Sequence, residues 1–347
     1  MHYILGQGLA GTCLAYRFLE ENIPFRIFDN DFKTSSSIIA AGLWNPIVFR
    51  RITKSWMADD LIHELEAFYP KIESELNTAF YHPQPILRIH SSLHEQNEWF
   101  EKMDSTAFKS YLQKGETPDN SPFGGGIVNK TGSINLSVFL SASRTYFTKM
   151  GNLIESDLSL PDNVADLENF SFNGETPKQI VDCRGAAIFD SPWWKYLPFN
   201  LSKGEILTIK CNGLHLNKIL NFNGIFILPL GNSTFRVGAT FSWDQLDRNP
   251  TESAKNELTD KFEKRVSLPY QIIDQQAGIR PSVADRRPLL GVHPDTEKLS
   301  IFNGLGTKGV MLAPYFSKSL FNLLVNKTPL SKEVDLSRFN KRYLKSK

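Results

Sequence analysis

The chain begins with the segment that decides its fold, HYILGQGLAGTCLAYRFLEENIPFRIFD at residues 2–29. Residues 2–5 form a short apolar run, and residues 12–21 carry apolar side chains at helical spacing. After Pro24, a second apolar run covers residues 25–28. The glycines at 6, 8 and 11 lie between the first run and the helical pattern. The segment predicts a strand, a glycine turn, a helix and a second strand, which is the opening unit of an α/β fold.

The spacing Gly6-x-Gly8-x-x-Gly11 has a physical reason. The first glycine permits a tight turn, the second lets the backbone approach a pyrophosphate, and the third lets helix and strand pack closely. Phosphates then lie against unpaired N–H groups at the helix N-terminus, where the dipole favours negative charge. Asp29 follows Gly6 by 29 − 6 = 23 residues, close to the spacing of a carboxylate that binds ribose hydroxyls. The alternative, a turn followed by a solvated acid, leaves the flanking strand and helix unexplained, so we expect an ADP-containing cofactor, either NAD or FAD.

Composition limits the class of protein. The chain has 347 residues, enough for two domains, with 41% hydrophobic and 22% charged residues, which excludes a disordered or coiled-coil protein. The net charge of 39 − 37 = +2 gives no global field that would hold a polyanion, although a local basic patch could exist. Aromatic residues reach 12%, with Phe 25, and favour thick cores or large apolar cavities.

Segments that suggest export, membrane insertion or metal binding are missing from the sequence. No apolar run approaches the 18 or so residues of a spanning helix, and no basic segment precedes the first strand, so we expect a cytoplasmic protein with no membrane partner. The odd number and wide spacing of Cys13, Cys183 and Cys211 fit neither disulfides nor a metal site. The histidines have no ligand spacing, and we expect no metal.

The middle and end of the chain predict two kinds of sheet. Short alternating strands with Gly-Asn turns at residues 205–210, 225–230 and 234–241 predict an antiparallel sheet. A strand interrupted by Pro83 and Pro85 is expected between residues 80 and 89, and further strands at 178–182 and 299–302. Helices are expected near residues 57–76, 136–150, 251–266 and 312–325.

Four blocks beyond the glycine turn carry a family resemblance. They are Ser36-Ser37-x-x-Ala40-Ala41-Gly42-Leu43, Val181-Asp182-Cys183-Arg184-Gly185-Ala186, Gly278-Ile279-Arg280-Pro281 followed by Asp285, Pro288, Gly291 and His293-Pro294, and Gly304 to Gly309 followed by Leu312-Ala313-Pro314. In order and spacing they resemble the D-amino-acid oxidase and glycine oxidase family of FAD enzymes, over nearly the whole chain. Asp182 and Arg184 depart from the family pattern, which has small apolar residues there.

The resemblance implies an α/β fold with a discontinuous Rossmann-like FAD-binding domain and an α+β substrate domain with a largely antiparallel sheet. We expect the FAD-binding domain at residues 1–45, 130–200 and 275–347, and the substrate domain at 46–129 and 201–274. FAD is expected to bind non-covalently, because no cysteine lies around residues 290–312, where sarcosine-oxidase relatives attach it. The expected cofactor-binding residues are Gly6, Gly8, Leu9, Ala10, Gly11, Asp29, Asn30, Ser36, Ser37, Ala41, Gly42, Leu43, Leu158, Gly185, Gly306, Thr307, Lys308, Gly309, Val310 and Met311.

Three residues are expected to act on the substrate or the flavin ring. By resemblance, Arg280 holds the substrate carboxylate, and a planar guanidinium can pair bidentately with such a group. Lys308 would place a cation near flavin N1 and C2=O, unless it is a solvated loop lysine. Phe226 stands where glycine oxidases present a tyrosine hydroxyl, which favours bulkier or less polar substrates than glycine, unless Phe226 belongs to the core. Arg280 could also be a surface arginine, and Trp44 is a further candidate for the cavity wall.

The C-terminal part carries a second resemblance. Leu305-Gly306-Thr307-Lys308-Gly309, Ala313-Pro314 and the basic tail from Arg338 to Lys347 look like the flavin domain of the bifunctional tRNA methylaminomethyl-thiouridine biosynthesis enzyme. We therefore expect FAD-dependent oxidation of the C–N bond of a small amino acid or N-substituted glycine by hydride transfer to flavin N5, with dioxygen or another acceptor taking the electrons. The alternative is oxidative removal of a carboxymethyl group from a tRNA wobble uridine.

Overall fold

The glycine turn directly follows an inner strand of a six-stranded sheet. The computed structural model describes residues 1–30, 35–116, 121–189 and 191–347. The sheet runs β11 (Leu153–Ile154), β2 (Phe25–Phe28), β1 (His2–Leu5), β12 (Gln179–Asp182), β19 (Leu299–Asn303) and β18 (Leu289–Val292). Neighbouring strands are parallel except β18, which pairs antiparallel with β19. This arrangement confirms the predicted α/β part of the fold.

Both faces of this sheet are covered, and successive side chains of a strand pack on opposite faces. Ile4 packs into a cluster shared by α1 (Leu9–Glu20), α3 (Ala58–Leu76), α5 (Leu136–Lys149) and α8 (Gly309–Asn326). Tyr3 and Leu5 point the other way, into a cluster with Trp193 and Trp194. The segments on that face include α6 (Val164–Glu168), η2 (Gly185–Ile188), η3 (Leu336–Phe339) and α9 (Asn340–Ser346).

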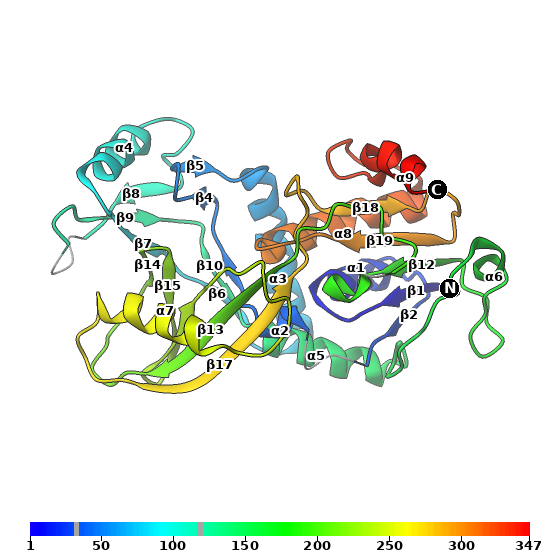
Figure 1. Cartoon of the computed structure of the whole chain (residues 1–347), viewed down its shortest axis with the longest axis horizontal. Coiled ribbons are helices and arrows are strands. Elements are labelled where there is room, and N and C mark those ends of the chain that lie inside the picture. The colour runs from blue at the N-terminus through cyan, green and yellow to red at the C-terminus, as the bar shows by residue number, and fades with distance from the viewer. Residues whose placement is uncertain (31–34, 117–120, 190) are drawn as a thin grey trace.

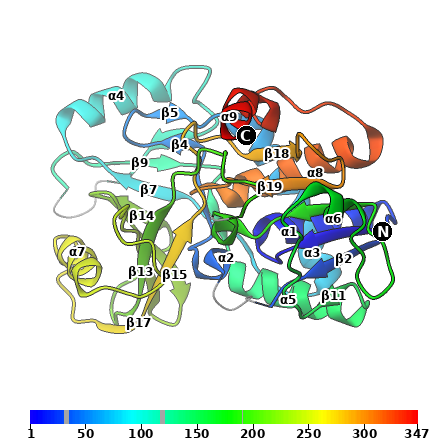
Figure 2. The same cartoon turned by 45° about the vertical axis from the view of Figure 1, so that its right-hand side comes forward.

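A second, eight-stranded sheet lies beside the first along the long axis of the molecule (Figure 1, Figure 2). Its order is β17 (Gln271–Arg280), β13 (Ser202–Lys210), β16 (Thr234–Gly238), β15 (Ile225–Gly231), β14 (Ile219–Phe222), β7 (Ile86–Ile89), β9 (Gly125–Val128) and β8 (Leu112–Lys114). All its neighbours are antiparallel except β14 and β7. The predicted, largely antiparallel second sheet is therefore confirmed. Helices α4 (Leu93–Met103) and α7 (Glu252–Glu263) accompany it.

Two small sheets and a short helix connect these parts. A three-stranded sheet joins β3 (Leu43–Trp44), β10 (Gly132–Ile134) and β6 (Tyr81–Pro83), and a hairpin joins β4 (Ile47–Val48) and β5 (Thr53–Lys54). Helix α2 (Ser36–Ile39) packs against β17. The domain boundaries expected near residues 45, 130, 200 and 275 stay a prediction.

Several predicted elements differ in their limits. The expected strand between residues 80 and 89 is two strands in different sheets, β6 and β7, because Pro83 and Pro85 lack the N–H that a continuous ladder needs. The helix expected from residue 312 begins at Gly309, whose bare backbone packs against Leu9. The strand expected at 234–241 ends regularly at Gly238, although Thr240 and Ser242 still bond to β13.

No helix in the described ranges is both long and apolar enough to cross a membrane.

Candidate active site

A cavity of about 710 Å³ lies where the glycine turn, α2 and the eight-stranded sheet meet. It brings together most of the residues predicted from the sequence, although they are spread over 300 positions of the chain. The predicted residues that line it are Gly6, Gly8, Leu9, Ala10, Asp29, Asn30, Ser36, Ser37, Ala41, Gly42, Leu43, Gly185, Phe226, Arg280, Gly306, Thr307, Lys308, Gly309, Val310 and Met311.

Two predicted cofactor residues lie outside the lining. A Cβ at Gly11 would overlap the carbonyl oxygen of Gly6, so Gly11 serves the close packing of α1 on the glycine turn. Leu158 is buried in the cluster that contains Phe28 and Leu167, and its neighbour Asp157 lines the cavity instead. The position of Asp157 has no signal in the sequence, because a single acid in a polar loop is indistinguishable from a solvated one.

The nucleotide end of the cavity has the form of an anion site. Gly6 adopts a φ of 92°, which favours glycine, and Gly8 is the N-cap of α1. The Leu9 N–H donates to the Ser37 hydroxyl at 3.1 Å, so a second polar group lies at the N-terminus of α1. At Gly42, a Cβ would overlap the carbonyl oxygen of Ile134. The bare backbone and the helix dipole fit the pyrophosphate of FAD.

Asp29 is held by two residues that the sequence did not indicate. The Gln7 N–H donates to Asp29 Oδ2 at 2.8 Å, and Arg144 Nη1 donates to Asp29 Oδ1 at 3.0 Å. Arg144 also donates to the side-chain oxygen of Gln7, at 2.8 Å. Arg144 lies on α5, 115 residues from Asp29, and no local pattern points to it. These contacts fix the orientation of the Asp29 carboxylate, which is predicted to bind ribose hydroxyls.

The departure at Asp182 and Arg184 has a local explanation. The Asp182 side chain has 0% exposure, and Arg184 donates to it from Nε at 2.9 Å and from Nη2 at 2.7 Å. Trp194 Nε1 adds a third donor at 3.1 Å. A buried carboxylate needs such partners. The two departing residues therefore compensate each other, while Gly185 still lines the cavity.

Arg280, at the end of β17, is clamped in the other half of the cavity. Its Nη1 donates to the carbonyl of Lys203 at 3.2 Å, and its Nη2 donates to the carbonyl of Thr240 at 3.1 Å. The guanidinium carbon lies 4.1 Å from the centroid of the Phe241 ring. A Cβ at Gly204 would overlap the guanidinium. Arg280 is therefore not a surface arginine: it lies between the backbone of Gly204 and the ring of Phe241.

Among the described residues, no acid forms an ion pair with Arg280. Burial lowers the pKa of the guanidinium to about 10, and burial is the one cause of that shift. Two carbonyl oxygens occupy part of its donor set, and an arginine has five N–H donors. The remaining donors and the charge are available to an anion in the cavity.

Lys308 is the N-cap of α8, and its ammonium is a second cation whose pKa is lowered. Its Nζ donates to the carbonyl of Asn45 at 3.2 Å and to the hydroxyl of Ser55. Burial lowers the pKa of the ammonium to about 8. The side chain therefore ties the glycine-rich loop to the β4–β5 hairpin and is not solvated. Its proximity to the flavin ring stays a prediction.

Of the two aromatic candidates, Phe226 lines the cavity and Trp44 does not. Phe226 on β15 lines the cavity, and its ring lies so close to Gly238 that a Cβ there would be 3.1 Å from Phe226 Cζ. Trp44 is 2% exposed, stacks on Tyr81 at 5.2 Å and donates to the carbonyl of Lys130. Trp44 is not part of the cavity lining.

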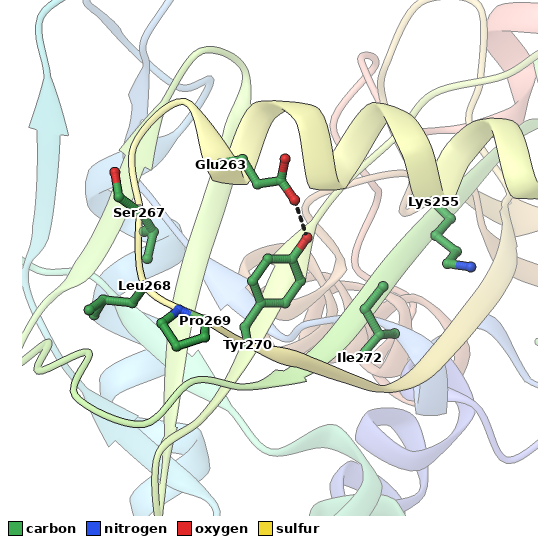
Figure 3. Close-up of a pocket in the computed structure, with 8 residues that line it drawn as sticks. Lys255, Glu263, Ser267, Leu268, Pro269, Tyr270 and Ile272 are labelled. Carbon is green, nitrogen blue, oxygen red and sulfur yellow. Dashed lines mark hydrogen bonds between the residues drawn. The ribbon is translucent and has the colours of Figure 1, made fainter.

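A second hollow lies between α7 and the start of β17, away from the glycine turn. It measures about 820 Å³, and Tyr270 and Glu263 point toward each other there, with a hydrogen bond of 2.7 Å (Figure 3). No sequence motif falls on its lining. Across the described ranges, no group of three or more His, Cys, Asp and Glu side chains is placed to hold a metal ion.

Comparison with known proteins agrees with this site. Residues 3–323 match the DAO family, described as FAD dependent oxidoreductase. The chain is 22% identical over 354 residues to a glycine oxidase of Bacillus subtilis (strain 168), covering 94% of each chain. A match to the glycine oxidase of Bacillus licheniformis is 27% identical but spans only 34% of that protein. The crystal structure of iminodiacetate oxidase from Chelativorans sp. BNC1 has a TM-score of 0.79 and 17% identity, over 96% of this chain and 98% of the other. This chain belongs to the DAO family of FAD-dependent oxidoreductases.

Proposed function

We propose that the protein oxidises the C–N bond of a small amino acid or N-substituted glycine whose carboxylate is bound by Arg280. The observation that carries the proposal is the buried Arg280 guanidinium, fixed between Gly204 and Phe241 in the cavity and without an acidic partner among the described residues. FAD, when bound, supplies the acceptor for the two electrons of this oxidation. The similar proteins, a glycine oxidase and an iminodiacetate oxidase, support a small carboxylated amine as substrate.

The residues of this chain would position the substrate. A carboxylate on Arg280 fixes one end of the molecule, and a fixed end turns the reaction with a bound cofactor into an intramolecular one. Phe226 offers an apolar wall where a hydroxyl would otherwise bind the carboxylate, and a lost hydrogen bond costs about 1–3 kcal/mol. The proposal therefore favours substrates larger or less polar than glycine. Dioxygen or another acceptor would then take the electrons.

The proposal does not extend to tRNA, because basic side chains of the C-terminal tail bind to other parts of this chain. Arg338 donates to the carbonyl of Pro288 at 2.8 Å and to Asp285 at 2.9 Å, and Arg342 donates to the carbonyl of Tyr196 at 3.1 Å. Lys347 pairs with Asp295 at 2.7 Å. These contacts fix η3 and α9 on the body of the protein and give Arg338, Arg342 and Lys347 partners within the chain.

The test is anaerobic reduction of the protein-bound flavin, followed by its visible absorption. Glycine, sarcosine, proline, iminodiacetate and a set of D-amino acids are added in turn to the holoenzyme, and at least one should bleach the flavin. In Arg280→Met the half-saturating concentration should rise by at least about 30-fold. Arg280→Lys should recover only part of the lost substrate affinity, because a lysine lacks the planar fork of the guanidinium. Undiminished reduction in Arg280→Met would refute the role of Arg280.

A further inference from the structure

The segment between β16 and α7, residues 239–250, holds the guanidinium of Arg280. The Thr240 carbonyl accepts from Arg280 Nη2 at 3.1 Å, and the Phe241 ring lies 4.1 Å from the guanidinium carbon. Both contacts come from the chain just beyond the regular end of β16 at Gly238. The orientation of Arg280 therefore depends on how firmly this segment is bound to the sheet.

The backbone of Lys203, on β13, binds the start of the segment. The Lys203 N–H donates to the carbonyl of Ser242 at 2.8 Å, and the Ser242 N–H donates to the carbonyl of Lys203 at 3.0 Å. The same Lys203 carbonyl accepts from Arg280 Nη1 at 3.2 Å. Lys203 is thus in contact with both the segment and the guanidinium that the segment holds.

The side chain of Lys203 binds the other end of the segment. It is 1% exposed, and its Nζ donates to Asp247 Oδ1 at 2.7 Å and to the carbonyl of Asn249 at 2.5 Å. Asp247 Oδ1 also accepts from the Asn249 N–H at 2.9 Å, which closes a turn there. One residue therefore binds the segment at Ser242 and again at residues 247–249.

The side-chain contacts of Lys203 lie on the sheet face opposite the cavity. Gly204, the next residue, lines the cavity, and a Cβ there would meet the Arg280 guanidinium. Because successive side chains of a strand point to opposite faces, the Lys203 side chain points away from Arg280. The segment passes from the cavity face, where it carries Phe241, to the far face, where the Lys203 ammonium binds it.

A neighbouring buried acid has other donors besides Lys203. Glu205 Oε1 lies 3.8 Å from Lys203 Nζ. Glu205 also accepts from the Thr251 N–H at 2.9 Å, from the Thr251 hydroxyl at 2.8 Å and from Gln275 Nε2 at 2.8 Å. These three donors remain when the lysine is replaced, so the acid stays hydrogen-bonded. Lys203→Met therefore removes the contacts at residues 247–249 without leaving a bare buried carboxylate.

We propose that Lys203 is a positioning residue of the substrate site, which acts through residues 239–250 to keep Arg280 in the orientation that binds a carboxylate. The inference rests on the proposed function and adds to the site a residue from the opposite face of the sheet. Without the ammonium, the segment keeps its backbone bonds at Ser242 but loses those at residues 247–249. The Phe241 ring then moves more freely and restricts the guanidinium less.

The first test is anaerobic flavin reduction by the holoenzyme with the amine that bleaches the flavin best. Lys203→Met should raise the half-saturating concentration about five- to twentyfold and change the limiting rate by less than about twofold. Asp247→Ala leaves the bond to the Asn249 carbonyl and should cause a smaller rise. In an Arg280→Met background, Lys203→Met should add less than about twofold, because residues that act through one another are not additive.

The second test, backbone hydrogen exchange, measures the binding of the segment without turnover. Lys203→Met should speed the exchange of residues 240–249 by at least about fivefold. Lys298→Met is the matched control, since Lys298 is a buried lysine whose Nζ donates to the carbonyls of Glu168 at 2.6 Å and Phe170 at 3.3 Å. It should speed exchange in that other loop and leave residues 240–249 and substrate affinity unchanged.

The outcomes separate the inference from the proposed function. Unchanged exchange in Lys203→Met would overturn the inference, as would faster exchange with an unchanged half-saturating concentration or a full further loss in the Arg280→Met background. An equal loss of substrate affinity in Lys298→Met would show a general loss of stability instead. If Lys203→Met does not fold, Asp247→Ala decides by the same two measurements. If no amine bleaches the flavin of the unmodified protein, the proposed function fails and the inference falls with it.

Discussion

The guanidinium of Arg280 lies 4.1 Å from the centre of the Phe241 ring. Phe241 therefore both lines the cavity and supports the cation within it. Phe241 is about half exposed, and its ring contacts both the Arg280 guanidinium and the Trp243 ring, whose centroid lies 6.2 Å away. Because the guanidinium can rotate about its long side chain, a flat partner limits the orientations that it adopts.

Phe241→Leu is expected to raise the half-saturating concentration of carboxylated substrates by about three- to tenfold, because a cation–π contact contributes about 0.5–2 kcal/mol. Phe241→Tyr keeps the flat ring and should stay close to the unmodified protein. Phe189→Leu, which makes the same change at an exposed phenylalanine outside the cavity lining, is the matched control. The idea fails if both leucine variants behave alike.

Gly204→Ala is expected to displace Arg280, because the new methyl group would overlap its guanidinium. Substrate binding should fall by more than about tenfold while the flavin stays bound, since the nucleotide end of the cavity is untouched. Gly278→Ala adds the same methyl group to the cavity-lining residue that pairs with Gly204 across the strands, but its nearest neighbours lie at 3.6 Å, an ordinary contact, so substrate binding should fall less than in Gly204→Ala. Titrations of flavin absorption with substrate measure both variants, and an unaffected Gly204→Ala protein would contradict the clamp.

Arg144→Met is expected to weaken FAD binding by about tenfold, because Asp29 loses a charged hydrogen-bond donor that fixes its carboxylate. Flavin fluorescence, quenched on binding to the protein stripped of FAD, gives the dissociation constant. Arg26→Met removes a different ion pair, with Glu175 at 3.1 Å, and should bind FAD normally. Equal losses in the two variants would point to a general loss of stability instead.

Lys308 should make stability depend on pH in the protein stripped of FAD. Its folded-state pKa of about 8 lies below the ordinary value of 10.5. Between these two pH values the unfolded chain keeps a proton that the folded protein has lost, so the free energy of unfolding rises with pH, by up to about 3 kcal/mol.

Lys308→Met lacks this ionisable group and should lack that rise, which urea unfolding at pH 7 to 10 would measure. Below pH 8 the buried charge no longer opposes folding in the variant, so the gap to the unmodified protein should be largest there. Lys264→Met changes an exposed lysine and should retain the full rise. A Lys308→Met protein with the unmodified pH dependence would show that another group is responsible.

Local patterns were sufficient for the nucleotide end of the site. Gly6, Gly8 and Asp29 lie within one strand–helix–strand unit, where chain geometry fixes their relation, and the cavity contains all three. Gly204 lies outside the strand expected at residues 205–210 and inside the observed β13, so its close approach to Arg280 was not indicated by the sequence. The limits of β6, β7 and α8 were less certain, because prolines and glycines act through contacts made elsewhere in the fold.

The sequence by itself determined the cofactor-binding fold and the second antiparallel sheet, and it predicted Arg280 as the candidate carboxylate ligand, because each depends on short-range periodicity or on an ordered set of motifs. Only the tertiary structure decided what surrounds those residues. Arg144 reaches Asp29 from 115 positions away, and Phe241, which lies beyond β16, packs on Arg280 at the end of β17. Such relations follow from which surfaces pack together, and packing between distant segments leaves no periodic trace in the chain.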